Sequence, residues 1–248
     1  MRRILTIMIV AMSIFSCADN DESNISLGPG EGAVGVGGST ARFVIKGDYL
    51  YIVTDVELKV LKLTTGQKPQ LVSEIPTTRG LETIFNLGNY LFLGAEDGVY
   101  IYNLINPANP SFITRYVHQL ACDPVIAQGS FAYLTLRDGT DCRGTGTNQL
   151  ITLDISDINS IVAVDTINML RPRGLTIFEG DLYVSEGAFG TKKFDISTPY
   201  RPHQDTLYDH IPSNDLIGLS DVLIVTENRG VSQFNSINDT LTLLSQIR

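Results

Sequence analysis

Charged residues recur at or just before short apolar segments of the sequence, and side chains of these types could bind a polar ligand. We call them the mixed-charge set: Arg42, Glu82, Asp123, Arg173 and Asp215. Guanidinium and carboxylate groups that converge on one hollow would orient a small polar molecule or a peptide terminus. The alternative is that these charges pair with one another and only stabilise the fold.

A second group of carboxylates recurs in polar turns, once in each part of the chain. We call it the acidic-turn set: Asp55, Glu96, Asp138, Glu186 and Glu227. Gathered on one rim, these residues would attract a cation or a basic partner. The alternative is that polar turns simply carry solvated charge.

The sequence contains no known catalytic or metal-binding motif. It has no G-x-S-x-G turn, no H-E-x-x-H pair and no calcium-loop spacing of acidic residues. His118, His203 and His210 fall in or near segments expected at the outer edge of the fold, so we expect no metal site. We therefore predict no catalytic residue, metal or cofactor, although two of the acids could still form the carboxylate pair of a glycoside hydrolase.

A repeat positions these candidate residues. A tight polar turn followed by an alternating apolar segment begins at residues 47, 88, 129, 180 and 220, a spacing of about forty residues with one longer copy. This period predicts an all-β fold, a five-bladed β-propeller of four-stranded antiparallel blades over residues 41–248. An all-β sandwich would explain the strands but not their equal spacing. The expected repeats are 41–77, 78–118, 119–168, 169–210 and 211–248.

Each repeat divides into four alternating segments, and the first is expected to line the centre of the ring. These inner segments are 43–46, 82–87, 124–128, 175–179 and 215–219. In a propeller, the loops that enter the inner strands and the turns between second and third strands open on the same face. Both charged sets are therefore expected on that face.

The start of the chain predicts export. Residues 1–16 combine a basic start with an apolar run too short to span a membrane, which is typical of a signal peptide. The end of this run, Ile14-Phe15-Ser16-Cys17, resembles the lipobox of bacterial lipoproteins, which implies that Cys17 is acylated. Residues 17–40 are polar and rich in Gly, and are expected to form a flexible tether. Their acidic start resembles the tethers of surface-exported lipoproteins of the Bacteroidetes.

Three cysteines in an exported chain can form one disulfide and leave one cysteine unpaired. Lipidation of Cys17 would account for the unpaired cysteine. Cys122 and Cys142 remain, and an oxidising compartment favours a disulfide between them. Such a bridge would close a loop of about twenty residues and contribute on the order of 3 kcal/mol. Two buried free thiols, or a redox pair, are the alternatives.

The repeat endings resemble the LVIVD-repeat family. The matching corners are Asp154-Ile155-Ser156-Asp157, Asp195-Ile196-Ser197-Thr198-Pro199 and, more loosely, Asn103-Leu104-Ile105-Asn106-Pro107. The resemblance covers residues 41–248 and implies a propeller and export, but no chemistry. An Asp or Asn at such a corner is expected to accept hydrogen bonds from the following backbone amides.

Composition and motifs together favour a binding or scaffold module over an enzyme. The net charge of −9 repels nucleic acid and anionic lipid, so membrane attachment would come from the lipid on Cys17. The expected location is the cell envelope, as an outer-membrane lipoprotein facing the periplasm or the cell surface. The expected partner is an envelope protein or a glycan. The alternatives are a propeller hydrolase or lyase acting on polysaccharide, weakened by the absence of Trp, and a purely structural repeat protein.

Overall fold

The structure is a computed structural model that describes residues 38–118, 124–139 and 146–248. These residues form strands and turns, and none of them belongs to a helix. The described ranges accordingly contain no helical segment that could cross a membrane.

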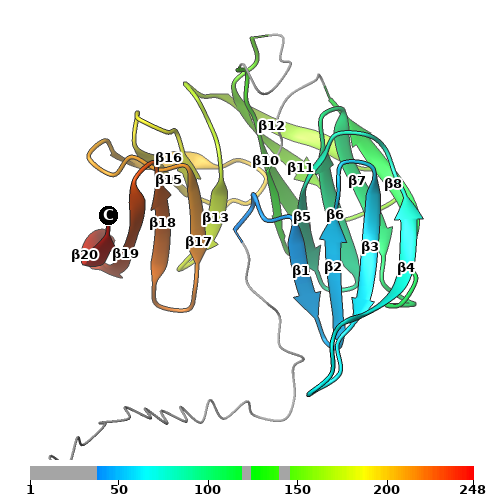
Figure 1. The fold of residues 1–248 in the computed structure, drawn as a ribbon. Coiled ribbons are helices and arrows are strands. Elements are labelled where there is room, and N and C mark those ends of the chain that lie inside the picture. The colour runs from blue at the N-terminus through cyan, green and yellow to red at the C-terminus, as the bar shows by residue number, and fades with distance from the viewer. Residues whose placement is uncertain (1–37, 119–123, 140–145) are drawn as a thin grey trace, which may run out of the picture. The chain divides into compact units, whose positions relative to one another are not determined.

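Every four consecutive strands form one antiparallel sheet, which we call a blade and number from one to five in chain order (Figure 1). The prediction of an all-β fold with five four-stranded blades is confirmed. In chain order the strands are β1 (Phe43–Lys46), β2 (Tyr49–Val53), β3 (Glu57–Lys62), β4 (Gln70–Pro76), β5 (Leu81–Leu87), β6 (Tyr90–Ala95), β7 (Gly98–Asn103), β8 (Ser111–Val117), β9 (Val125–Gln128), β10 (Phe131–Leu136), β11 (Gln149–Asp154), β12 (Val162–Asn168), β13 (Leu175–Phe178), β14 (Asp181–Ser185), β15 (Thr191–Asp195), β16 (His203–Tyr208), β17 (Asp215–Gly218), β18 (Leu223–Glu227), β19 (Gly230–Ile237) and β20 (Thr240–Ile247).

The hydrophobic core lies between neighbouring blades. Strand β6 is apolar on both faces and almost wholly buried, because Leu91 and Leu93 contribute to the core with blade one while Phe92 contributes to the core with blade three. Four clusters of this kind join the five blades in sequence. The alternating apolar residues thus give blades two, three and four two packed faces each.

One buried aromatic residue occupies the same place in the second strand of each of the first four blades. These residues are Tyr51, Phe92, Tyr133 and Tyr183, none of them more than 2% exposed. Two of the hydroxyls reach the next blade. Tyr51 donates to the carbonyl of Pro107 at 2.9 Å, and Tyr133 donates to the carbonyl of Pro199 at 3.0 Å. The proline corners of blades two and four are therefore tied to the blade before them.

The corners that resemble the LVIVD repeat have the predicted hydrogen bonds. The Asp154 carboxylate accepts from the backbone N–H of Ser156 at 2.8 Å, and Asp195 accepts from that of Ser197 at 2.7 Å. Side-chain and then backbone hydrogen bonds from Ser156 lower the pKa of the Asp154 carboxyl, and backbone and then side-chain hydrogen bonds from Ser197 lower the pKa of the Asp195 carboxyl. The expectation of a pinned turn at these two corners is confirmed.

The pairing of the third strand with the fourth shifts register once in every blade. The shift occurs at the same place in the repeat, after Val60, Ile101, Thr152, Lys193 and Gln233. Such a β-bulge bends and twists the outer strand relative to its neighbour.

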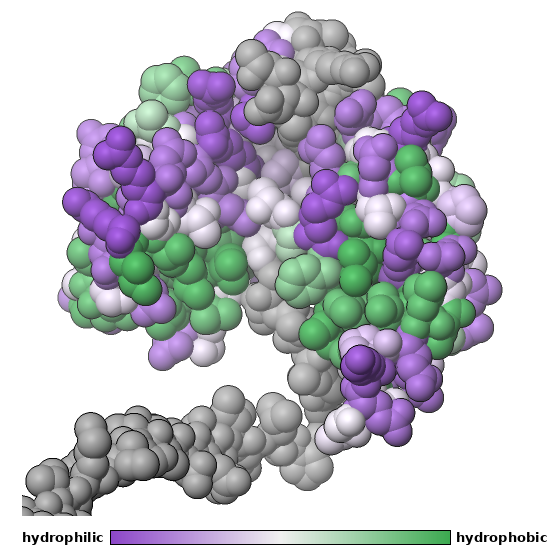
Figure 2. Space-filling model, in the orientation of Figure 1, coloured by the Kyte–Doolittle hydropathy of each residue, from purple (hydrophilic) through white to green (hydrophobic). Residues whose placement is uncertain are grey.

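The first and fifth blades each have one less well covered face. Leu91, Leu182 and Leu223 are fully buried, whereas Leu50, which occupies the same place in β2, is only half-buried. Phe43, at the start of β1, is 56% exposed. Figure 2 shows hydrophobic side chains over β1 to β3 and over the lower part of the fifth blade.

Residues 38–41 link blades that are distant in sequence. The Ser39 hydroxyl accepts from the backbone N–H of Leu175 at 2.7 Å and donates to Asp215 at 3.3 Å. The carbonyl of Ala41 accepts from the N–H of Ile84 at 2.9 Å. Figure 1 shows this segment, in blue, between β13 and β5. Composition places residues 38–40 in the flexible tether, but Gly38 and Ser39 are buried because blades four and five provide their partners.

Candidate functional site

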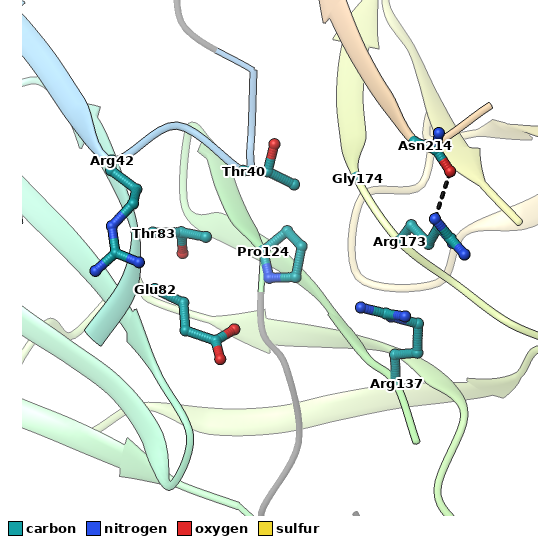
Figure 3. A pocket seen from close by; sticks show the side chains of 9 residues that line it. All are labelled: Thr40, Arg42, Glu82, Thr83, Pro124, Arg137, Arg173, Gly174 and Asn214. Atoms are coloured by element: carbon teal, nitrogen blue, oxygen red, sulfur yellow. Dashed lines mark hydrogen bonds between the residues drawn. The ribbon is translucent and has the colours of Figure 1, made fainter. Parts of the chain in front are cut away.

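A polar hollow of about 340 Å³ lies where the inner strands begin, and we call it the mouth pocket (Figure 3). All five blades contribute to it, because the lining residues lie in or just before the inner strands, except Arg137, which follows the second strand of blade three. The lining residues are Thr40, Arg42, Glu82, Thr83, Pro124, Arg137, Arg173, Gly174 and Asn214.

Arg173 is held in the mouth pocket by several hydrogen bonds. Its backbone N–H donates to the carbonyl of Ser185 at 2.8 Å, and its own carbonyl accepts from the Thr135 hydroxyl at 2.6 Å. One guanidinium nitrogen donates to the side-chain oxygen of Asn214. The Nε atom is buried and has no hydrogen-bond partner. Burial, and then repulsion from Arg137 and Arg171, lower the pKa of Arg173.

The other wall of the mouth pocket carries Arg42 and Glu82. Arg42 donates to the carbonyl of Leu81 at 2.8 Å, so its guanidinium lies close to the first residue of β5. Figure 3 shows Arg42 and Glu82 on one side of the pocket and Arg137, next to Arg173, on the other. Glu82 and Arg137 each have an interaction partner in the structure.

The structure brings three of the mixed-charge set together. Arg42, Glu82 and Arg173 line the mouth pocket, Asp215 lies beside it, and Asp123 is outside the described residues. Sequence analysis did not select Arg137, although it directly follows the second strand of blade three, in the turn that carries Asp138 of the acidic-turn set. The position in the repeat was the only signal that could have identified it.

The Asp215 side chain binds the segment formed by residues 38–40. Its carboxylate accepts from the hydroxyls of Ser39 and Thr40. A Cβ atom at Gly174 would collide with this carboxylate and lie 2.8 Å from the Cα of Asp215, so only glycine fits between them. Burial raises the pKa of Asp215, and hydrogen bonds from Thr40, Leu216 and Ser39 partly oppose that rise.

Replacing Asp215 by asparagine is expected to change how stability depends on pH. With the folded-state pKa raised above 3.8, the folded chain binds this proton more tightly than the unfolded chain does. The contribution of Asp215 to stability is therefore greatest below 3.8 and falls as pH rises through the folded-state pKa. We expect urea denaturation to show Asp215→Asn gaining stability relative to wild type between about pH 4 and about pH 7.

Thr40→Val gives a matched comparison, because it removes a hydrogen bond that lowers the pKa of Asp215. The fall in stability with pH should then be steeper than in wild type. A stability difference between Asp215→Asn and wild type that stays constant across this pH range would contradict the account.

The acidic-turn set occupies several environments. Glu186 is fully buried, ion-paired with Lys192 at 3.0 Å, and accepts from the N–H of Leu170 at 2.6 Å. Glu227 is half-buried and accepts from the Ser232 hydroxyl at 2.6 Å. The remaining three residues are half-buried or exposed: Asp55, Glu96 and Asp138. Glu186 and Glu227 thus have local structural partners.

Metal ligands do not cluster in the described ranges, which contain no group of three or more His, Cys, Asp or Glu side chains that could hold an ion. The three residues on which the lipidation and disulfide expectations rest, Cys17, Cys122 and Cys142, lie outside the described residues. A second hollow, of about 530 Å³, is built by blades four and five alone, and Glu227, Arg229 and Arg248 are its charged residues.

Five consecutive four-stranded blades, packed face to face beside a polar hollow, define the β-propeller class. No family model and no curated protein matches the sequence. Among solved structures, the chain is similar to a periplasmic gluconolactonase of Pseudomonas aeruginosa, with 13% identity and a TM-score of 0.63 over 81% of this chain and 67% of that one. It is also similar to a candidate 6-phosphogluconolactonase of Bacteroides fragilis, with 12% identity and a TM-score of 0.62 over 83% of this chain and 69% of that one. At such identities the likeness concerns the fold.

Proposed function

We propose that the chain is an exported lipoprotein whose propeller is a binding module, with the mouth pocket as its ligand site and a glycan or an envelope protein as its partner. The observation that carries this proposal is the convergence of polar side chains from all five blades on one hollow. Propellers of unrelated function use this place for ligands because the inner strands of every blade meet there.

The chemistry of the pocket lining supports binding. The nine lining residues that the structure describes include no histidine, cysteine or serine, so they offer no nucleophile paired with an imidazole base. Its volume is near the lower end of the range for small-molecule sites, about 300–1,000 Å³, and suits one sugar unit or one side chain better than a long polymer.

Binding is tested with the full-length protein, purified in detergent, on a panel of neutral and acidic glycans. We expect at least one class of glycan to bind, and Arg42→Gln to weaken that binding because Arg42 lines the mouth pocket. Arg79→Gln, a change outside the pocket lining, serves as the matched control. Binding that is equally strong in Arg42→Gln and wild type would place the ligand site elsewhere on the protein.

Anchoring and the disulfide belong to the same proposal, together with membership of the LVIVD-repeat family. An acylated Cys17 would fix the protein to the outer membrane, and a bridge between Cys122 and Cys142 would pin the long insertion of blade three. Mass spectrometry of the native protein without reductant tests both. We expect an acylated Cys17 at the N-terminus and a Cys122–Cys142 bridge. An unmodified Met1 with free thiols would reject export.

A second candidate function is hydrolysis, and the structural neighbours described as gluconolactonases favour it. Glu82 could act as a general base opposite Arg137 and Arg173, which could stabilise an oxyanion. Incubation of the protein with δ-gluconolactone and with polysaccharides, followed by measurement of released acid or reducing ends, separates the two candidates. Rates equal to the buffer rate in every assay would leave the binding module as the supported function.

A further inference from the structure

The described lining of the mouth pocket has the opposite charge to the protein as a whole. The chain carries a net charge of −9, yet the lining residues that the structure describes include three arginines and a single carboxylate, that of Glu82. In Figure 2 hydrophilic side chains are dense around the upper end of β1, where the inner strands begin. A basic hollow on an acidic protein concentrates anions at one place.

Two of the arginines lie close enough to repel each other. The positive charges of Arg137 and Arg171 both disfavour the charged form of Arg173, in addition to the cost of its burial. Figure 3 shows the guanidinium groups of Arg137 and Arg173 side by side at the pocket wall. An anion bound against this wall would reduce the repulsion and compensate the buried charge.

Arg173 also keeps an unused donor. Its Nε atom is buried and without a hydrogen-bond partner, although another nitrogen of the same group donates to Asn214. The buried Nε atom lies against Gly187, so a ligand in the mouth pocket would meet the other guanidinium nitrogens of Arg173. Carboxylate and phosphate oxygens match the fork of donors that a guanidinium presents.

The opposite wall suits hydroxyl groups. Glu82 accepts hydrogen bonds from hydroxyls, and Thr40 and Thr83 can donate or accept. No aromatic side chain is among the described residues that line the pocket, so these residues offer a flat apolar ligand no surface on which to stack. The ligand should therefore carry its charge at one end and hydroxyl groups at the other.

We propose that the mouth pocket binds an acidic sugar, with the carboxylate or phosphate of the sugar held by Arg137 and Arg173 and its hydroxyl groups facing Glu82 and Thr83. This inference rests on the proposed function and narrows it to acidic glycans or their free sugar acids. Bidentate contacts to the guanidinium fork provide most of the affinity, and the hydroxyl contacts select a sugar over a simple anion.

The test compares three probes by isothermal titration calorimetry on the full-length protein: glucuronate, glucose and inorganic phosphate. Glucuronate and glucose share a sugar ring, but only glucuronate carries a carboxylate. Comparing their dissociation constants therefore isolates the effect of that charge. We expect glucuronate to bind with a dissociation constant of about 1 mM or tighter, glucose not to bind, and phosphate to bind more weakly than glucuronate. Added salt should weaken glucuronate binding, because the contact is between charges.

Arg173→Gln should weaken glucuronate binding roughly 10- to 100-fold, because it removes charge-assisted hydrogen bonds. Arg137→Gln is the second variant, in case the first fails to fold, and thermal unfolding of each reports the fold. Arg201→Gln is the matched control, since Arg201 is exposed in the loop between β15 and β16 and lies outside the pocket lining. It should bind glucuronate like wild type.

The outcomes separate this inference from the proposed function. Glucose binding as tightly as glucuronate would overturn the anion contact while leaving a glycan-binding pocket. Phosphate binding as tightly as glucuronate would support the anion contact and overturn the role of Glu82 and Thr83. Binding of none of the three probes to folded protein would overturn the inference, and the glycan panel would still judge the binding module independently.

Discussion

Replacing Tyr133 by alanine is expected to lower the free energy of unfolding by about 3–5 kcal/mol. Tyr133 is 1% exposed and belongs to the core cluster that joins blades three and four, so truncation leaves a cavity between two sheets. Its hydroxyl also donates to the carbonyl of Pro199, and Tyr133→Phe removes that bond alone, at a cost of about 1 kcal/mol. Urea denaturation followed by circular dichroism measures both changes.

Tyr200→Ala is the matched control. Tyr200 follows Pro199 directly but is 54% exposed, so its truncation should change stability by less than about 0.5 kcal/mol. Equal losses for Tyr133→Ala and Tyr200→Ala would show that packing between the blades does not determine stability at this interface.

Lys193→Met is expected to destabilise the protein by about 2–3 kcal/mol. The Lys193 side chain is 5% exposed, and its ammonium lies 3.0 Å from Asp181, 3.4 Å from Asp205 and 3.6 Å from Asp239. Burial alone would lower the pKa of Lys193, but hydrogen bonds and attraction from Asp181 raise it above 10.5. Methionine fills the space yet leaves the carboxylates without their cation. The loss is smaller than for a fully dry ion pair, because Asp205 and Asp239 are half or more exposed.

Lys59→Met is the comparison for this change. Lys59 pairs with Glu57 and Glu74, both at 2.9 Å, but its side chain is 33% exposed, so we expect a loss below about 1 kcal/mol. Chemical denaturation at neutral pH tests both variants, because the raised pKa keeps Lys193 charged there. A loss for Lys193→Met no larger than that for Lys59→Met would contradict the role given to burial.

The blades could be predicted from the sequence because two independent patterns agree. The alternation of apolar residues gives strands, and the spacing of the polar turns near forty residues gives their grouping in fours. The bulges could not be predicted in this way. They arise where the third strand meets the fourth, as after Lys193, and no residue type marks that place in all five copies.

The buried end of the tether escaped prediction for a related reason. Ser39 is buried by contacts with Leu175 and Asp215, which lie 136 and 176 residues further along the chain. Its neighbours are glycine, serine and threonine, and their composition is that of a flexible segment. Long-range partners of this kind leave no periodic pattern in the sequence.

The pocket was predictable in part. Arg42, Glu82 and Arg173 occupy comparable places at the start of the inner strands, so the repeat alone brought them to one face. Asp215 shares that position, but the Ser39 and Thr40 hydroxyls occupy its carboxylate. Glu186 shows the same limit for the acidic-turn set, because its partner Lys192 follows the turn and draws the carboxylate into the core.

The bulge that recurs in every blade also affects how separate molecules meet. Each blade ends in an outer strand whose free edge could pair with the edge of another copy, and five such edges would make a molecule prone to stacking into fibres. A twisted, bulged edge aligns poorly with a second one. Every repeat thus forms a blade whose bulged outer edge hinders aggregation. Straightening a single blade would leave the contacts between neighbouring blades intact and reduce solubility.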